Sequence, residues 1–272
     1  MKKIVSLLLV LAMMMALAAC GTTPAETTAP VETTAPVETT APVETTAPVE
    51  TTEPAAELVV DTVILKEADD KMLNTYSVIA VNPEAPFVDA DGNAVADVAV
   101  NTAGADALYQ WLVSQEALDM AGAYGVAEYG SNLFYVKEDA PVYADPIAAA
   151  TEETKVIRLS TTTSVNDSGL LAKLLPEFES KYGYTVEVFS AGTGKSINNA
   201  KMGNADIILV HSKSQEEAFI EAGFARTVEG FEAERVSFIY NYYVLCGPSA
   251  DPAGVAAAAS VMDAFAAIAD GQ

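Results

Sequence analysis

The chain is poor in cysteine, histidine and positive charge. Of its 272 residues two are cysteine and one is histidine, and 14 Lys and Arg stand against 38 Asp and Glu, giving a formal net charge of -24. Such an acidic surface argues against nucleic acid and anionic lipid headgroups as partners, because both attract basic surfaces. His211 alone does not form a metal site, and we expect no metal and no cofactor. No catalytic triad, carboxylate pair or Cys/His cluster stands out, so the sequence predicts no enzyme.

The two cysteines define no disulfide framework. Cys20 ends the stretch MKKIVSLLLVLAMMMALAAC, whose basic start, short apolar run and small-residue end are typical of an export signal. The LAAC ending resembles the lipobox of bacterial lipoproteins, which implies a lipid on Cys20 and a chain anchored to the cell membrane outside the cytoplasm. Cys246 lies in the aromatic run FIYNYYVLCGP, which predicts a buried side chain rather than a reactive thiol.

A six-residue repeat, ETTAPV, fills most of residues 21–57. Regular Pro, β-branched Thr and spaced Glu offer nothing to bury and favour an extended chain. We therefore expect a disordered tether, which at ~3.1 Å per residue could reach on the order of 100 Å. From residue 58 onward the composition is that of a globular domain, and 58–272 are expected to form one α/β lobe.

Residues 58–139 predict strands at VVDTVILK and YSVIAVNP, a helical run from Ala103, and a short strand at NLFYV. The spacing of apolar residues in the helical run places Trp111 in the core, and Ser114 is placed to cap a second helix. Residues 140–154 contain two prolines and indicate a connection.

Residues 155–272 alternate between strand and helix patterns. The strands are KVIRLS, TVEVFSA and ADIILVHS, and the helices are LLAKLLPEFESKYG, SINNAKMG and SQEEAFIEAG. This alternation predicts a mostly parallel sheet flanked by helices. A β-rich run, VSFIYNYYVLCGP, and an Ala-rich helix near 253–269 follow.

Two of the strands are followed by turns rich in hydroxyl groups, at residues 160–169 and 190–196. The second, SAGTGKS, is similar to a nucleotide-phosphate loop, but Phe189 occupies the position that needs the first glycine, which excludes ATP. In a parallel sheet ligands bind at the carboxyl ends of the strands. The two turns would bring the following hydroxyls to one edge: Ser160, Thr161, Thr162, Thr163, Ser164, Thr193 and Ser196.

Such neutral donors suit a fully deprotonated oxyanion, which accepts hydrogen bonds and donates none. An equally simple interpretation is a Thr-rich strand end followed by a helix cap at Asn166, Asp167 or Ser168. Lys195, at the start of a helix, either assists an anion or is a solvated surface lysine. These alternatives remain open at the level of the sequence.

In order along the chain, TTTS-x-x-DSGLL, GTG, DxxLVH and GPxxDPAG cover about 115 residues. Together they resemble the amino-terminal half of the tungstate-binding proteins of ABC importers. The resemblance implies a periplasmic-binding-protein-like (type II) lobe, a tetrahedral oxyanion such as tungstate or molybdate as ligand, and an ABC transporter permease as partner. It also implies a set of oxyanion-binding residues: Thr162, Thr163, Ser164, Thr193, Gly194 and Thr161.

The order of the segments departs from this family. Residues 58–139 resemble its carboxyl-terminal end, yet they precede the amino-terminal half, and the chain stops at Gln272 without an RGDDSGT-like second-lobe segment. We therefore expect a circularly permuted or truncated arrangement in which both segments share one sheet. A lone lobe would bind its ligand about three orders of magnitude more weakly. The alternative is a surface interaction or sensor lipoprotein, or a remnant that keeps the fold without effective ligand capture.

Overall fold

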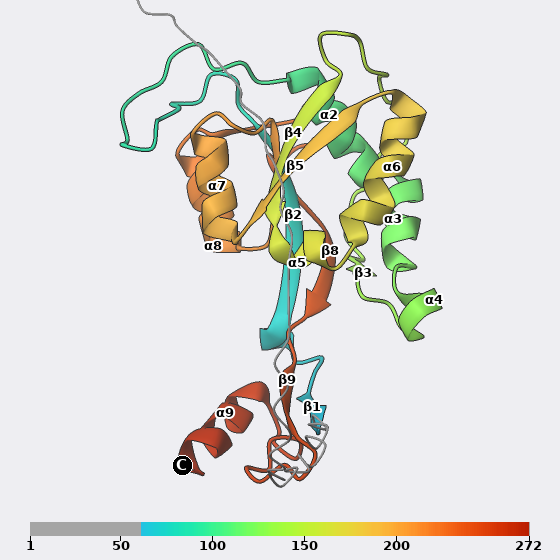
Figure 1. The fold of residues 1–272 in the computed structure, drawn as a ribbon, viewed down its shortest axis with the longest axis vertical. Coiled ribbons are helices and arrows are strands. Elements are labelled where there is room, and N and C mark those ends of the chain that lie inside the picture. The colour runs from blue at the N-terminus through green and yellow to red at the C-terminus, as the bar shows by residue number, and fades with distance from the viewer. Residues whose placement is uncertain (1–60, 272) are drawn as a thin grey trace, which may run out of the picture. The chain divides into compact units, whose positions relative to one another are not determined.

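The structure is a computed structural model that describes residues 61–271. The predicted export signal, Cys20 and the repeat of residues 21–57 lie outside the described residues. A seven-stranded sheet has the order β3-β8-β2-β6-β4-β5, and β7 also pairs with β2 (Figure 1). The strands are β2 (Leu73–Val81), β3 (Tyr135–Val136), β4 (Val156–Thr162), β5 (Thr185–Ala191), β6 (Ile207–Val210), β7 (Ala225–Arg226) and β8 (Arg235–Tyr242).

The predicted strand-helix alternation after residue 155 is confirmed. Strand β4 pairs in parallel with β5 on one side and β6 on the other. The intervening helices are α5 (Thr163–Asp167), α6 (Leu170–Tyr182) and α7 (Thr193–Lys201), and α8 (Lys213–Glu221) follows β6. The short helix α5 was not predicted, because its residues are also compatible with a turn.

Strand β2, from the amino-terminal segment, occupies the middle of the sheet. It runs antiparallel to both β6 and β8, and β3 of the same segment pairs antiparallel with β8. The predicted α/β fold with a helix-flanked sheet is confirmed, but the sheet is more mixed than the expected mostly parallel one. The reason is that the pattern of β2, buried along six consecutive residues, does not specify the direction of the strand, and antiparallel pairing is slightly the more stable.

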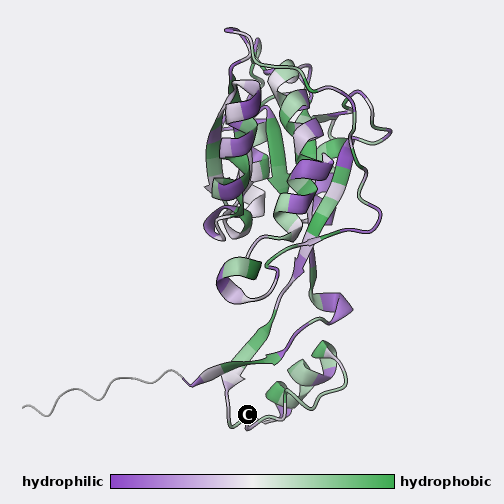
Figure 2. Cartoon of the chain, turned by 90° about the vertical axis from the view of Figure 1, so that its right-hand side faces the viewer, coloured by the Kyte–Doolittle hydropathy of each residue, from purple (hydrophilic) through white to green (hydrophobic). Residues whose placement is uncertain are grey.

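Helices cover both faces of the sheet (Figure 1). One core packs α2 (Thr102–Leu112), α3 (Gln115–Gly122) and α6 against the strands, and includes the fully buried Trp111. As predicted, Ser114 caps α3, its hydroxyl accepting from the Ala117 amide. The second core lies under α7 and α8, where Phe219 and Ile197 contact the strands. Figure 2 shows hydrophobic strands between helices whose outer residues are hydrophilic.

A separate two-stranded sheet pairs β1 (Thr62–Lys66) with β9 (Leu245–Pro248). The β-rich run near the carboxyl end therefore splits into β8 and β9, which belong to different sheets. The prediction that Cys246 is buried is wrong: it is exposed on β9, because a two-stranded sheet leaves its free faces uncovered. The last helix, α9 (Val261–Asp270), begins later than predicted, with Ser260 as its N-cap.

Helix α4 (Val126–Tyr129) lies between α3 and β3 in the chain. A 3-10 turn at Asp70–Met72 precedes β2. Within residues 61–271, every helix falls short of the length and hydrophobicity needed to span a bilayer.

Candidate functional site

The two hydroxyl-rich turns open at the same edge of the sheet. Strands β4 and β5 are parallel, and their last residues, Thr162 and Ala191, are register partners. Helix α5 begins at Thr163, directly after β4, and helix α7 begins at Thr193, two residues after β5. The residues predicted to bind an oxyanion are thus carried to adjacent positions by two neighbouring strand ends.

Three of the hydroxyls at this edge are used inside the fold. The hydroxyl of Thr161 donates to the carbonyl of Leu209 at 2.7 Å, which ties β4 to β6. Ser196 donates to the carbonyl of Thr161 at 2.6 Å, and Ser160 donates to the carbonyl of Ser196 at 2.9 Å. All three are fully buried. Ser160 and Ser196 hold helix α7 against β4, and the Thr161 hydroxyl has already donated its proton to β6 and has none to offer a ligand.

The remaining hydroxyls are not tied to the backbone of the fold. Thr163 and Ser164 are exposed. Thr162 lies beneath them, 1% exposed, with its hydroxyl 3.2 Å from that of Ser164. On the other turn, Thr193 Oγ1 and the nearby Ser190 Oγ are buried without a hydrogen-bond partner among the described residues. A buried hydroxyl of this kind carries a desolvation cost that a ligand would remove.

Backbone amides add to these donors. The first N–H groups of a helix have no partner within the helix, and neither α5 nor α7 has a side-chain cap. The N-cap of α6 is Gly169, at a φ of 84° that glycine adopts without strain, and not Asn166, Asp167 or Ser168 as predicted. The Ser168 hydroxyl nevertheless accepts from the Leu170 amide, the first of α6, at 3.4 Å. Gly194 lies in the first turn of α7, and a Cβ there would meet Gln215 Oε1 of α8 at 3.2 Å.

A chain of hydrogen bonds reaches Ser164 from the central strand β2. The Tyr76 hydroxyl donates to Ser164 Oγ at 2.9 Å and accepts from Asn74 Nδ2 at 2.9 Å. Asn74 Nδ2 also donates to Asn241 Oδ1 of β8 at 2.9 Å. Burial raises the pKa of Tyr76, so its phenol stays protonated. Because Ser164 accepts from Tyr76, its own proton is free to point toward Thr162 or a ligand.

Sequence reasoning missed Tyr76, Asn74 and Asn241. They lie in apolar strand patterns, and the 88 residues between Tyr76 and Ser164 separate them in the chain. The polar residues at alternate positions of β2 were the one available signal, and it does not identify a partner.

The charged and titratable residues at this edge have modest roles. Lys195 is exposed on α7, in agreement with the surface-lysine interpretation. His211 follows β6 with its ring centroid 5.2 Å from that of Tyr76. Burial lowers the pKa of His211, which keeps the imidazole neutral at neutral pH. Residues 61–271 hold no group of three or more His, Cys, Asp or Glu side chains able to bind a metal ion.

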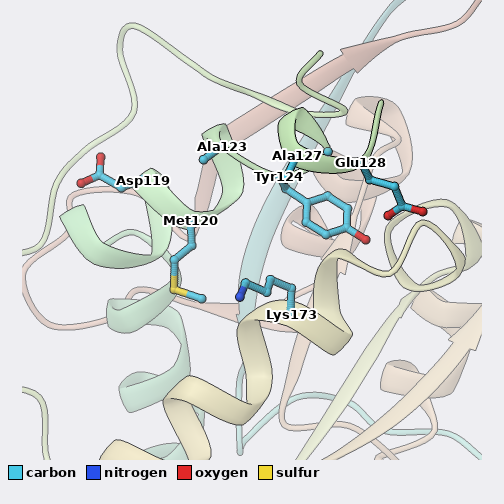
Figure 3. A pocket seen from close by; sticks show the side chains of 8 residues that line it. Asp119, Met120, Ala123, Tyr124, Ala127, Glu128 and Lys173 are labelled. Carbon is cyan, nitrogen blue, oxygen red and sulfur yellow. The ribbon is translucent and has the colours of Figure 1, made fainter. Parts of the chain in front are cut away.

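An apolar groove of about 520 Å³ lies elsewhere, between α3, α4 and α6 (Figure 3). Met120 and Tyr124 lie on one side of it and Lys173 on the other. Tyr124 donates to the carbonyl of Ser168 at 2.7 Å and thereby supports the turn between α5 and α6. The groove contains none of the residues predicted to bind an oxyanion and offers an anion few donors.

A comparison with known protein families agrees with the fold and with the position of the candidate site. Residues 148–272 match the family described as the PBP superfamily domain. The matched segment contains β4 to β9 and both turns of the site. This part of the chain, somewhat less than half of its length, is therefore similar to the PBP superfamily domain, in agreement with the α/β fold of the lobe.

Among curated proteins, the chain is similar to two tungstate-binding proteins TupA. It is 47% identical to that of Peptoclostridium acidaminophilum over 96 residues, which is 35% of this chain and 31% of the relative. It is 32% identical to that of Campylobacter jejuni over 82 residues, or 30% of this chain and 28% of the relative. The chain thus spans less than a third of the length of these relatives.

A solved structure gives a match of similar extent. The tungstate binding protein TupA from Desulfovibrio alaskensis G20 is 33% identical, with a TM-score of 0.32, over 42% of this chain and 43% of that one.

Proposed function

We propose that the chain is a substrate-binding protein for a small oxyanion, without enzymatic activity, and that tungstate or molybdate is the ligand. The single observation that carries the proposal is the meeting of two donor-rich turns at one edge of the sheet, with Thr193 Oγ1 buried and unpartnered among the described residues. The similarity to proteins named as tungstate-binding supports the choice of anion.

The proposed ligand set is Ser164 and Thr163 from the first turn, and Thr193 with the Gly194 amide from the second. Thr162 lies beneath Ser164 and supports it. Hydroxyls and amides can neutralise a dianion by hydrogen bonding while avoiding a lasting ion pair. The chain has a net charge of -24, so a bound anion depends on such local donors.

The proposal includes delivery of the anion to an ABC transporter permease from outside the cytoplasm, with Cys20 carrying the lipid anchor. The periplasmic-binding-protein family supports the extracytoplasmic position. The LAAC sequence, which lies outside the described residues, supports the anchor.

Calorimetric titration of the purified protein with tungstate, molybdate, sulfate and phosphate tests the proposal. We expect saturable binding with tungstate or molybdate preferred. Ser164→Ala should lower the affinity about tenfold or more, because it removes one hydrogen bond to a charged group. Ser180→Ala, on the exposed side of α6, is the matched control and should bind as the wild type does. Equal affinities of the two variants would contradict the proposed ligand set.

A second candidate is a surface interaction lipoprotein, and the exposed side chains of α9 favour it. Met262 and Phe265 are 57% and 52% exposed on a helix that is apolar on most sides. Large exposed apolar groups of this kind often mark contact surfaces. The absence of heat with all four oxyanions would favour this second function over the first.

A further inference from the structure

A polar cavity of about 360 Å³ lies at the start of β2 and just after the end of β6, near the candidate site but on different strands. Thr75 of β2 and Ser237 of β8, which both carry hydroxyls, belong to its lining. Lys137 lines it from just after β3, the outermost strand next to β8. His211, just after β6, and Lys213, the first residue of α8, also line it. The cavity thus draws on four neighbouring parts of the fold.

Every charged residue that lines this cavity carries a positive charge. Lys137, Lys213 and Arg235 belong to the lining, and no Asp or Glu does. The chain as a whole has 38 acidic residues against 14 Lys and Arg. The lining of this cavity is therefore basic although the chain as a whole is acidic, and its positive potential favours an anion.

The acidic partners of these three cations lie outside the lining. The fully buried Glu216 pairs with Arg235 through Nε, which leaves both Nη groups free of hydrogen bonds within the described part of the chain. Lys137 and Lys213 pair only with exposed carboxylates, those of Asp139 and Glu217.

Those two surface pairs contribute little energy, so both ammonium groups are available to a ligand. The Lys213 pair is long, at 3.6 Å between Nζ and the carboxylate oxygen, and Lys213 is 72% exposed. Arg235, by contrast, is held in place by Glu216 and is 22% exposed. The guanidinium and the two ammonium groups come from β8, from the residue after β3 and from the start of α8, and would meet an anion from these three elements.

The cavity adjoins the proposed oxyanion site, because Asn74 lines it and supports Ser164 through Tyr76, but the proposed ligands of the two sites are different residues. It shares no residue with the turns at Thr162–Ser164 and Thr193–Gly194. In the sheet, β2 is separated from β4 by β6, which places the two strands about 10 Å apart. The volume exceeds the needs of one tetrahedral oxyanion, and Leu73 and Tyr243 offer apolar surface to a carbon skeleton.

We propose that this cavity is a second anion site and that it binds a small organic di- or tricarboxylate. The carboxylates pair with Arg235, Lys137 and Lys213, and the hydroxyls of Thr75 and Ser237 are within the same lining. His211, neutral through burial, supplies a ring rather than a charge.

Calorimetric titration of the whole protein with citrate and succinate, and with sulfate and phosphate for comparison, tests this site. We expect saturable binding of the carboxylates, weakened about tenfold by Lys137→Gln and again by Lys213→Gln. Lys155→Gln is the matched control, since Lys155 is exposed and precedes β4 at the opposite edge of the sheet. Circular dichroism of each variant checks that the fold is retained.

The two proposed sites are tested independently of each other. Ser164→Ala should weaken tungstate binding and leave citrate binding unchanged, and the two lysine variants should do the reverse. The second site is wrong if neither carboxylate binds, if the lysine variants bind as the wild type does, or if Ser164→Ala abolishes citrate binding. Sulfate or phosphate binding as tightly as citrate would overturn the assignment of a carboxylate ligand.

Discussion

At the scale of single residues, the direction of the hydrogen bonds around Ser164 is the decisive feature. Asn74 donates to Tyr76 and Tyr76 donates to Ser164, so each hydroxyl accepts a hydrogen bond from within the fold, and Ser164 keeps its own proton for Thr162 or a ligand. A site built of outward donors favours anions that are fully deprotonated and disfavours those, such as hydrogen phosphate, that must also donate. Tyr76 acts here as a positioning residue, since it reaches a ligand only through Ser164.

Replacing Tyr76→Phe should therefore weaken oxyanion binding about five- to tenfold, because Ser164 loses the partner that orients it. The double variant with Ser164→Ala should bind no more weakly than Ser164→Ala alone, since the two residues act through one hydrogen bond. Calorimetry on the four proteins of this cycle gives the coupling. Tyr240→Phe, on β8, is the control and should match the wild type; additive losses at Tyr76 and Ser164 would contradict the positioning role.

At the scale of elements, Asp206 joins three segments at the start of β6. Its buried carboxylate accepts from the Asn101 amide at 2.9 Å and the Arg158 amide at 2.7 Å. It also pairs with the Arg158 guanidinium at 2.6 Å. Asn101 caps α2 and Arg158 lies in β4, so one carboxylate holds a helix and two strands in register.

We expect Asp206→Ala to lower the free energy of unfolding by about 3–5 kcal/mol, because it leaves two backbone amides without their acceptor and removes the only carboxylate that the Arg158 guanidinium pairs with among the described residues. Urea denaturation followed by circular dichroism measures the change. Glu177→Ala, an exposed position on α6, should stay within about 0.5 kcal/mol of the wild type. A loss below about 1 kcal/mol for Asp206→Ala would show that the junction relaxes without the carboxylate.

At the scale of the whole molecule, the sheet contains strands from both sequence segments. Strand β2, from 58–139, lies between β6 and β8, from 155–272. This pairing is what a permuted arrangement requires, and we propose that arrangement for residues 58–272. The candidate site depends on it, since Tyr76 of the first segment supports Ser164 of the second.

The pH dependence of global stability is expected to reflect His211, the one histidine of the sequence. Burial lowers its pKa below the ordinary value of 6.5, so the unfolded chain binds a proton at a pH where the folded chain does not. The associated stability is complete above pH 6.5 and is lost as the pH falls toward the folded-state pKa.

Urea denaturation between about pH 7 and pH 5 should therefore show a falling free energy of unfolding, and His211→Gln should make the fall shallower. Identical pH slopes for the two proteins would show that the imidazole has the same proton affinity in both states. Tyr240→Phe, which leaves the histidine in place, serves as the control.

Local patterns predicted much of the fold and part of the site. The alternation of apolar residues at periods of 2 and 3.6 identified β4 to β6 with their helices, and the hydroxyls that follow β4 and β5 had to share an edge once those strands were parallel. Ser114 as a cap and Trp111 in the core follow from equally short-range chemistry.

What the sequence by itself determined is therefore the set of elements and the donor-rich turns, because hydrophobic periodicity and capping act over a few residues. Only the tertiary structure decided that β2 lies between β6 and β8, that the hydroxyls of Thr161 and Ser196 donate to carbonyl groups inside the fold, and that Cys246 is exposed. The physical reason is that strand pairing and hydrogen bonds join residues far apart in the chain, as Tyr76 and Ser164 are, and a local pattern does not specify its distant partner.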